Sequence, residues 1–171
     1  MPQVISPCGG SGGGGSDLPT ARMTQLVSPF ADSGFNLSAI SFVSSPLETN
    51  DATVFASGTS GGTTTIKVLT TGTYMAWATV RGELTSPPAA GSYLQVYGTC
   101  TFRDPFDESR WGDWHDTDGF GDYEAGATNG ILWIPDVVPG FFFLRAGQNS
   151  GSNIQLHATI TIVRTSPIAI A

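Results

Sequence analysis

The chain has 171 residues and a formal net charge of −7, and its length suits one compact domain. Charged residues make up 12% of the sequence, about half of the roughly 25% found in an average domain. This low share excludes a charge-rich disordered polymer and a basic nucleic-acid-binding protein. Lys, Arg, Glu and Gln, which usually fill exposed helix faces, number 16 together, whereas Ser and Thr number 37, so the composition predicts an all-β protein.

The first 36 residues are predicted to form an N-terminal anchor peptide, a Gly/Ser linker and an extended arm. Residues 9–16 read GGSGGGGS, a composition typical of a flexible coil. The short head in front of this linker cannot fold alone. It contains Pro2, Gln3, Val4 and Ile5. These four residues form either a peptide that docks on another protein by adding a strand or a disordered terminus.

Neither a signal peptide nor a membrane span is expected. Residues 1–8 have no basic region and no apolar region of the kind that a signal peptide needs. The longest apolar stretch, residues 131–144, is interrupted by Pro, Gly and Asp and is too short to cross a bilayer. If the protein works outside a cell, we expect it to leave by another route than a cleaved signal.

A β-domain is predicted over residues 37–171, where short apolar segments alternate with turn residues. The last segment is the clearest, because apolar residues occupy every second position from Ile154 to Ile162. Strands are expected over residues 39–43, 53–56, 63–69, 73–80, 92–102, 131–134, 141–144 and 154–163. No helical periodicity of useful length occurs, so the expected architecture is an antiparallel β-sandwich or jelly roll.

Nearly all of the net charge lies in one segment. Residues 101–126 carry 8 acidic and 2 basic residues, and the rest of the chain is almost neutral. Residues 103–126 show no clear periodicity and are therefore expected to form an acidic insertion loop. A loop of this length inside a compact domain is usually functional or disordered.

Three interpretations of the acidic loop stay open. In the first, it only packs on a neighbouring subunit or lies in solvent. In the second, it binds a receptor or a sugar, with tryptophan rings for stacking and carboxylates that accept hydroxyl hydrogen bonds. The residues for this role are Trp111, Trp114, Asp116, Asp118 and Tyr123. In the third, it binds Ca²⁺, which takes oxygen ligands, although the spacing does not match an EF-hand. The calcium ligands would be Asp113, Asp116, Asp118, Asp122 and Glu124.

No catalytic motif accompanies these residues. His115 and His157 are the only histidines, no Gly-x-Ser-x-Gly elbow is present, and no His/Cys cluster has zinc spacing. The two cysteines, Cys8 and Cys100, are too few to define a disulfide framework and are expected to be free thiols, with an intermolecular disulfide through Cys8 as the alternative. We therefore expect no enzymatic activity and no cofactor other than the calcium already considered.

The order of these features resembles the C1q/TNF-like jelly-roll family. Residues 66–78, with Gly72 and Tyr74, look like the Gly-x-Tyr hairpin of that family, and residues 151–164 look like its closing strand. The resemblance covers residues 37–166. Two features depart from it: the sequence His-Ala-Thr at 157–159 stands where a Phe-Gly-rich signature is usual, and the acidic segment is an insertion.

The resemblance implies a ten-strand jelly roll that forms a symmetric homotrimer, has no catalytic activity and acts by recognition or by capping a larger structure. Phe141, Phe142 and Phe143 agree with a trimer, because they place rings on both faces of one strand and only one face can be covered by the partner sheet. We expect Tyr74 and these three residues at the subunit interface. The alternative is that a loop of the same chain covers the strand.

A docking peptide, a linker, one jelly roll and no secretion signal together predict a bacteriophage virion structural protein. The protein would be a trimeric surface knob on the particle, joined through its N-terminal peptide to the capsid as decoration or to the tail tip as a minor tail protein. Its expected partners are its own copies, other virion proteins and a host cell-surface glycan, without nucleic acid or membrane insertion. The alternative is a stand-alone C1q-like carbohydrate-binding or adhesion module.

Overall fold

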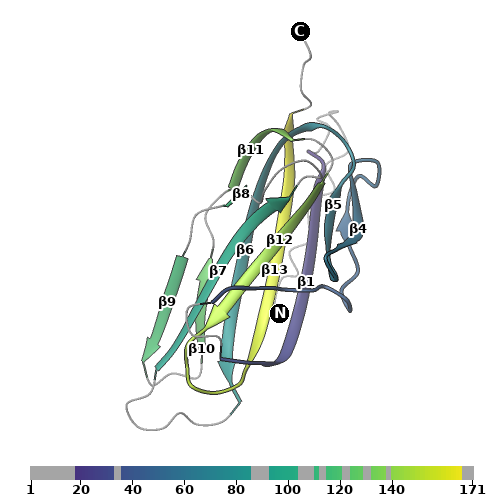
Figure 1. The fold of residues 1–171 in the computed structure, drawn as a ribbon. Helices are drawn as coiled ribbons and strands as arrows, with labels where there is room; N and C mark the ends of the chain where they lie inside the picture. Colours follow the sequence, from purple (N-terminus) through teal and green to yellow (C-terminus); the bar gives the residue numbers. More distant parts are fainter. Residues whose placement is uncertain are drawn as a thin grey trace, which may run out of the picture.

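The computed structural model describes residues 18–32, 36–85, 93–103, 110–111, 115–120, 124–128, 132–137 and 140–166, with the segments between 104 and 139 described by their backbone. This part of the chain is a sandwich of two antiparallel sheets (Figure 1). The expected all-β antiparallel sandwich is confirmed. Across the described ranges there is no helix that could cross a membrane.

Sheet A has the strand order β10-β6-β13-β1-β3, and β11 also pairs with β6. Its strands are β1 (Thr20–Phe30), β3 (Glu48–Thr49), β6 (Gly72–Leu84), β10 (Glu124–Thr128), β11 (Leu132–Val137) and β13 (Ile154–Ser166). Every pair of neighbouring strands in this sheet is antiparallel. The long strands β6 and β13 therefore lie side by side at its centre.

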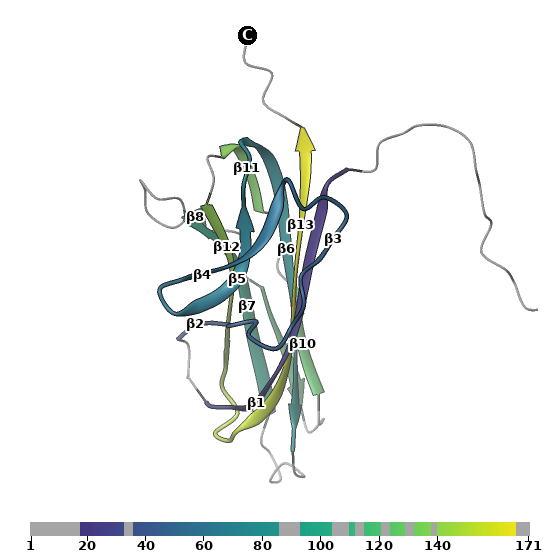
Figure 2. The same cartoon turned by 90° about the vertical axis from the view of Figure 1, so that its right-hand side faces the viewer.

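Sheet B has the strand order β4-β5-β12-β7-β8, with β2 also paired to β12 and β9 to β7. Its strands are β2 (Ser38–Ala39), β4 (Phe55–Ser60), β5 (Thr63–Val68), β7 (Tyr93–Arg103), β8 (Arg110–Trp111), β9 (His115–Phe120) and β12 (Gly140–Gln148). Figure 2 shows the two sheets from the side, with β1 and β13 in one layer and β12 in the other.

The period-two pattern explains the long strands. In β13 every second residue from Ile154 to Ile162 is fully buried, and in β6 the same holds from Tyr74 to Val80, because successive side chains of a strand point to opposite faces. The strands expected over 63–69, 73–80, 92–102, 131–134, 141–144 and 154–163 are confirmed as β5, β6, β7, β11, β12 and β13, with shifted ends.

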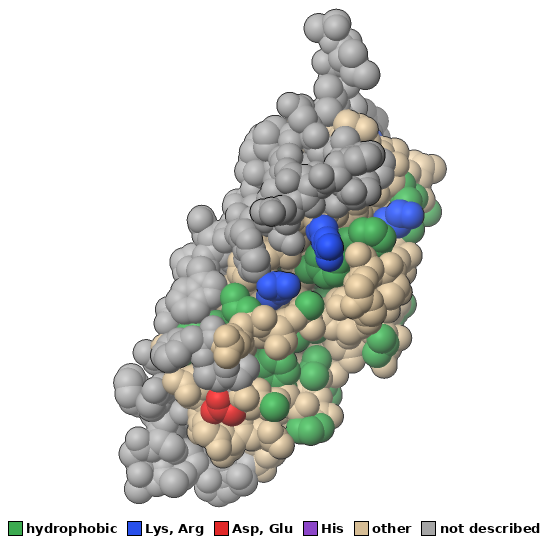
Figure 3. Space-filling model, viewed as in Figure 1, with side chains coloured by type: hydrophobic (Ala, Val, Ile, Leu, Met, Phe, Trp, Pro, Cys, Tyr) green, Lys and Arg blue, Asp and Glu red, His purple; other side chains and the backbone are tan. Residues whose placement is uncertain are grey.

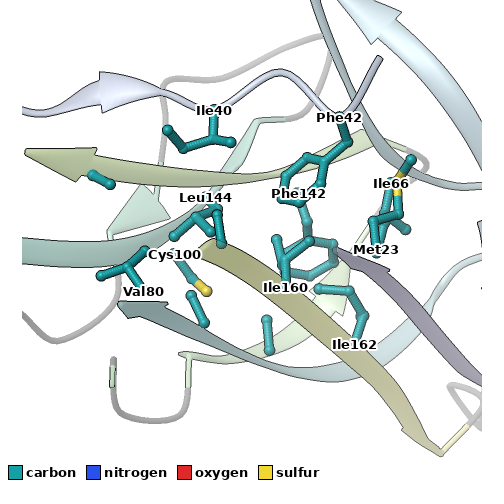
Figure 4. Packing of buried hydrophobic residues seen from close by; sticks show 14 of the residues in the cluster. Met23, Ile40, Phe42, Ile66, Val80, Cys100, Phe142, Leu144, Ile160 and Ile162 are labelled. Atoms are coloured by element: carbon teal, nitrogen blue, oxygen red, sulfur yellow. The ribbon is translucent and has the colours of Figure 1, made fainter. Parts of the chain in front are cut away.

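The core between the sheets is apolar and rich in aromatic rings (Figure 4). The ring of Phe142 in β12 lies 4.7 Å from the ring of Phe102 and 6.2 Å from that of Tyr74, measured between centroids. Rings tilted at such distances attract each other beyond the effect of their buried area. The aromatic cluster thus joins β6 of sheet A to β7 and β12 of sheet B.

Two glycines bring the sheets close together at one place. A Cβ atom added to Gly98 in β7 would lie 2.8 Å from Cγ2 of Val80, and one added to Gly82 in β6 would lie 2.6 Å from Cγ2 of Val96. Each glycine therefore faces a valine of the opposite sheet, and a larger residue there would push the sheets apart.

The expected domain boundary at residue 37 is wrong, because the sandwich already includes β1. This strand pairs with β13 from Thr20 opposite Val163 to Phe30 opposite Ile154, and it buries Ala21 and Met23. The alternation of buried and exposed side chains in β1 is clear only up to Met23, because no residue from Thr24 to Pro29 is fully buried. The sequence from Thr20 to Phe30 is thus part of the domain and not an extended arm.

The segment expected as a strand over residues 39–43 pairs only at its start, where β2 ends at Ala39. Beyond it, the Ile40 N–H donates to the carbonyl oxygen of Leu144 at 2.9 Å, and the Phe42 N–H donates to that of Thr64 at 2.9 Å. Both side chains are buried in the core. The strand expected over 53–56 begins two residues later, as β4.

Candidate functional site

The acidic segment was expected to form a single loop. This expectation is wrong, because the segment contributes strands to both sheets. Strands β8 and β9 pair with β7 in sheet B, and β10 pairs with β6 in sheet A. Asp118 in β9 is paired with Gln95, whereas Glu124 in β10 is paired with Glu83 of the other sheet. Strands of this kind extend a sheet through backbone hydrogen bonds, which need no alternation of apolar residues. The sequence therefore gave no periodic sign of them.

The residues expected to bind a sugar, a receptor or calcium are only partly described. Trp111 lies in β8, Asp116 and Asp118 lie in β9, and Glu124 opens β10. Outside the described residues are Trp114, Tyr123, Asp113 and Asp122, together with Pro2, Gln3, Val4 and Ile5 of the docking peptide. Within the described ranges, no group of three or more His, Cys, Asp and Glu residues is placed to hold a metal ion. Both ligand hypotheses stay predictions.

Two of the four residues expected at a subunit interface lie in the core instead. Tyr74 and Phe142 are fully buried between the sheets. The hydroxyl of Tyr74 donates to the carbonyl oxygen of Thr70 at 2.7 Å, and burial raises the pKa of Tyr74. Because β12 alternates, only Phe141 and Phe143 lie on the outer face of sheet B, where the expected interface remains a prediction.

The outer face of sheet B is basic and aromatic. It carries three of the seven Lys and Arg residues of the chain, Lys67 in β5, Arg103 in β7 and Arg145 in β12. Phe141 is paired with Lys67 on one side and with Arg103 on the other. The Lys67 Nζ atom lies 5.9 Å from the centre of its ring, within the range of a cation–π contact. Figure 3 shows basic groups among apolar ones on this side of the molecule.

A hollow of about 230 Å³ opens on the same face, and we call it the arginine hollow. Arg103 and Arg145 line it, with Phe143 between them along the sheet. The other lining residues are Ala39, Ser60, Gly61, Thr63 and Thr101. The described residues around the hollow therefore combine two positive charges with hydroxyl groups and one aromatic ring, and none of them is acidic.

The outer face of sheet A has a different character. Its central part, which we call the threonine face, consists of the seven uncharged residues Thr24, Met75, Trp77, Thr79, Thr159, Thr161 and Val163, and it is bordered by the exposed Arg22 of β1, which is paired with Thr161. One row across three strands is made only of threonines, and in it the hydroxyl oxygens of Thr24 and Thr159 lie 3.2 Å apart.

Charged groups lie toward both ends of this sheet: Arg22 is paired with Glu48 toward one end, and Arg81, Glu83 and His157 lie toward the other. Glu83 Oε2 lies 3.6 Å from an Arg81 nitrogen and 3.8 Å from His157 Nε2. His157 is about half exposed, as its place among the polar residues of its strand predicts.

The sequence reasoning did not identify the arginine hollow. One sign of it was present, because the alternation Phe141, Phe143, Arg145 places an arginine on the same face as two rings. Arg103 is the last residue of a different strand, β7, while Ser60 ends β4 and Gly61 lies in the turn between β4 and β5. Only the folded sheet brings these three elements together.

Comparisons with known proteins give the fold. No protein-family model matches the chain, and no curated protein matches it. Among solved structures, the globular domain of zebrafish complement 1qA protein superimposes with a TM-score of 0.50 over 88% of this chain and 99% of that one, at 7% identity. The structure of Eiger TNF from S. frugiperda gives a TM-score of 0.50 over 88% and 93%, at 10% identity. The chain therefore has the C1q/TNF jelly-roll fold.

Proposed function

We propose that the chain is a non-enzymatic structural protein of a bacteriophage virion, a homotrimeric knob joined to the capsid or the tail tip by its N-terminal peptide. The observation that carries the proposal is the C1q/TNF jelly roll itself, since the resemblance to that family implies a trimeric module that acts by contact. The Gly/Ser segment in front of β1 supports attachment to something larger.

The threonine face is the better of the two sheet faces for a trimer. Its seven residues are uncharged, with one arginine, Arg22, at its edge. Met75 and Trp77 on it are half-buried in the single chain, so a neighbouring copy would remove more apolar area from water. A trimer through the outer face of sheet B would gather Lys67, Arg103 and Arg145 of three copies, and like charges in an interface are unfavourable.

The position of the strand ends supports attachment from one side. Thr20 at the start of β1 is paired with Val163 near the end of β13. The chain therefore enters and leaves the described sandwich at the same end, while the turn between β12 and β13 lies at the other. Around a three-fold axis along the strands, three N-terminal segments would point together toward the particle. An eight-residue Gly/Ser linker spans about 15 Å.

The trimer is tested by measuring the mass of the protein in solution by light scattering. We expect three times the 17.9 kDa of the chain. Thr79→Arg, at the centre of the threonine face, should give a folded monomer, because three added charges would meet. The matched control is Ser57→Arg on the edge strand β4, where the side chain is exposed and the mass should not change. A monomeric native protein would overturn the trimer.

The attachment is tested by deleting residues 1–16. We expect the shortened protein to fold and to form the same oligomer, but to be absent from purified phage particles. As a control, GGSGGGGS is replaced by eight Gly and Ser residues in another order, which should leave incorporation unchanged. Incorporation of the shortened protein would refute the anchor, and absence of the full-length chain from particles would favour a stand-alone module.

A further inference from the structure

The outer edge of β4 is a strand edge without a partner strand, and the chain itself carries a segment that fits it. We propose that this edge binds residues 3–6 of the same chain, Gln-Val-Ile-Ser, as one more antiparallel strand of sheet B. We call these four residues the donor segment. The proposal concerns the free protein and gives the N-terminal peptide a binding site on its own domain.

Strand β4 ends sheet B and lies at the margin of the molecule (Figure 1), paired only with β5 in the described part of the chain. In β5, the Thr64 N–H donates to Ser41 Oγ at 3.0 Å, and the Thr64 carbonyl oxygen accepts from the Phe42 N–H at 2.9 Å. Neither group therefore points to β4. Thr59, which is opposite Thr64, turns its own N–H and C=O groups away from β5.

The backbone of Ser57 points the same way. The pairing of β4 with β5 runs without a register shift from Phe55 to Ser60, and the residues that bond to a neighbouring strand alternate along it. The N–H and C=O groups of Ser57 and Thr59 therefore form what we call the open edge. Both residues are exposed, and no described residue bonds to these four groups. Such an edge is a template for another extended chain.

Strand β4 has none of the features that usually keep a strand edge unpaired. It contains no charged residue, no proline and no bulge. The edge of β1 is different, because Ser45 Oγ accepts from the Thr24 N–H at 3.0 Å. Farther along β1, Gln25 Nε2 donates to the carbonyl oxygen of Leu26 at 2.8 Å. Side chains thus cover the edge of β1, whereas the open edge of β4 is left for a strand.

The place where the described chain begins brings the donor segment within reach. Asn50 Nδ2 donates to the carbonyl oxygen of Leu18 at 3.1 Å, and the Phe55 N–H donates to that of Asp51 at 3.1 Å. Because Asn50 and Asp51 are neighbours, these contacts keep Leu18 within about 20 Å of the start of β4. The eight-residue Gly/Ser linker spans about 15 Å, so it can carry the donor segment to the open edge.

The linker also sets the direction of the added strand. Strand β4 begins near Leu18 and runs from there toward the turn at Gly61. An antiparallel donor segment has its last residue near the start of β4, where the linker arrives. A parallel one would need the linker to reach the other end of β4, roughly 15 Å farther. The antiparallel arrangement is therefore the one that the linker length favours.

The donor segment matches the open edge in length and in conformation. Pro2 and Pro7 flank it, and because proline has no N–H, they limit the strand to the four residues between them. Two of these residues, at alternating positions, are enough to form the four hydrogen bonds that the open edge offers. Val4 and Ile5 are β-branched and favour an extended backbone.

Gly58 provides a place for one side chain of the donor segment. A Cβ atom added to Gly58 would lie 2.9 Å from Cε1 of Phe141, so this glycine lies under the ring on the outer face of sheet B. Val4 or Ile5 stands opposite Gly58 in the two registers that the prolines allow. Its side chain would lie on the same face and pack against the partly exposed ring of Phe141.

This inference does not rest on the proposed attachment to a particle. Binding of the donor segment is measured on the free protein, and attachment is measured on purified particles. A chain that is incorporated but leaves the open edge free would refute only this inference. A chain that covers the open edge but is absent from particles would refute only the attachment.

The test is hydrogen exchange of single backbone amides, followed by NMR on the full-length protein. We expect the amides of Ser57 and Thr59 to exchange about tenfold more slowly than in the protein without residues 1–16, because a tethered segment binds at a high effective concentration. The amides of Ala56 and Gly58 are the internal control. They face β5 and should change much less.

Variants of the donor segment and of β4 locate the contact. Val4→Pro combined with Ile5→Pro removes one hydrogen-bonding residue in either register and should abolish the slow exchange. The matched control exchanges the two side chains, Val4→Ile with Ile5→Val, and should keep it. Thr59→Pro removes an N–H of the open edge but none that bonds to β5, so the Ser57 amide should then exchange quickly in a folded protein.

The monomeric Thr79→Arg variant and dilution separate the own chain from other donors. Slow exchange that persists in this variant and does not change with protein concentration supports the proposal. Slow exchange that is lost in the monomer would mean that a neighbouring copy donates the strand, and this would overturn it. Slow exchange that survives deletion of residues 1–16 would show another occupant, such as β4 of a second copy. Fast exchange in the full-length protein would equally refute the proposal.

Discussion

Cys100 shows how burial changes a single titratable group in this fold. Its side chain has no exposed area, and burial raises the pKa of the Cys100 thiol to about 12, because the charged thiolate loses its hydration. The folded state therefore favours the neutral thiol. This contribution to stability is complete below the ordinary thiol pKa of 9.0 and is lost as the pH rises from there toward 12.

We expect Cys100 to be unreactive in the folded protein. In a Cys8→Ser variant, a thiol-specific reagent at pH 8 should not react with the native chain but should react with one thiol once the chain is unfolded in guanidinium, because the thiolate is the reactive form. Absorbance of the released chromophore measures this. Rapid reaction of the native protein would contradict the burial of Cys100.

The neighbouring residues Phe141 and Phe142 should contribute unequally to the free energy of unfolding. We expect Phe142→Ala to lower the free energy of unfolding by about 3–5 kcal/mol, because it removes a fully buried ring from the aromatic cluster. Phe141→Ala, its matched control on the outer face of sheet B, should cost about 1 kcal/mol. Urea unfolding measures both, and equal costs would contradict the alternation of β12.

At the scale of elements, the sequence predicted the strands that need an apolar face and missed those that do not. The alternation in β6 and β13 is regular because one face of each packs in the core. In β1, only Ala21, Met23 and Phe30 are buried in eleven residues, too few to show a period. Strands β8, β9 and β10 pair with β6 and β7 through backbone hydrogen bonds, which need no periodic pattern of apolar residues.

The candidate site could be predicted even less. From the sequence, ligand-binding residues were predicted in the acidic segment and interface residues at Phe141 to Phe143. Of the described residues among these, only Phe143 lines the arginine hollow. The residues that line the hollow with Phe143 come from β7, about 40 residues earlier in the chain, and from the hairpin of β4 and β5, about 80 residues earlier. Their meeting depends on the strand order of sheet B, which no local pattern contains.

Gly98 and Val80 test how closely the two sheets approach. We expect Gly98→Ala to destabilise the protein by about 1–3 kcal/mol, because the new methyl group would overlap Cγ2 of Val80. The double variant Gly98→Ala with Val80→Ala should lose about 1 kcal/mol less than the sum of the two single changes, since the smaller residue makes room. Urea unfolding of all four proteins measures the coupling, and strict additivity would refute the contact.

At the scale of the whole molecule, the concentration of acidic residues at 101–126 makes a bound metal ion a hypothesis to test. Asp116 and Asp118 lie in the extended strand β9, with backbones roughly 7 Å apart, and Glu124 lies in the other sheet. Calcium needs about six to eight oxygens around one point. We therefore expect the same Tm in EDTA and in calcium chloride, measured by calorimetry. A Tm raised by calcium and lowered again by EDTA would establish a metal site, and Asp116→Asn would then show whether β9 takes part.

The pairing of the first strand with the last has a consequence for how the protein is made. In sheet A, β1 lies between β13 and the short β3, so its main hydrogen-bonding partner is the final strand of the sandwich. Contacts between residues more than a hundred positions apart form slowly, because the closure of a long loop precedes their gain. During synthesis on the ribosome, Thr20 to Phe30 can pair with β13 only after Ile154 to Ser166 have left the exit tunnel, so sheet A is completed only then.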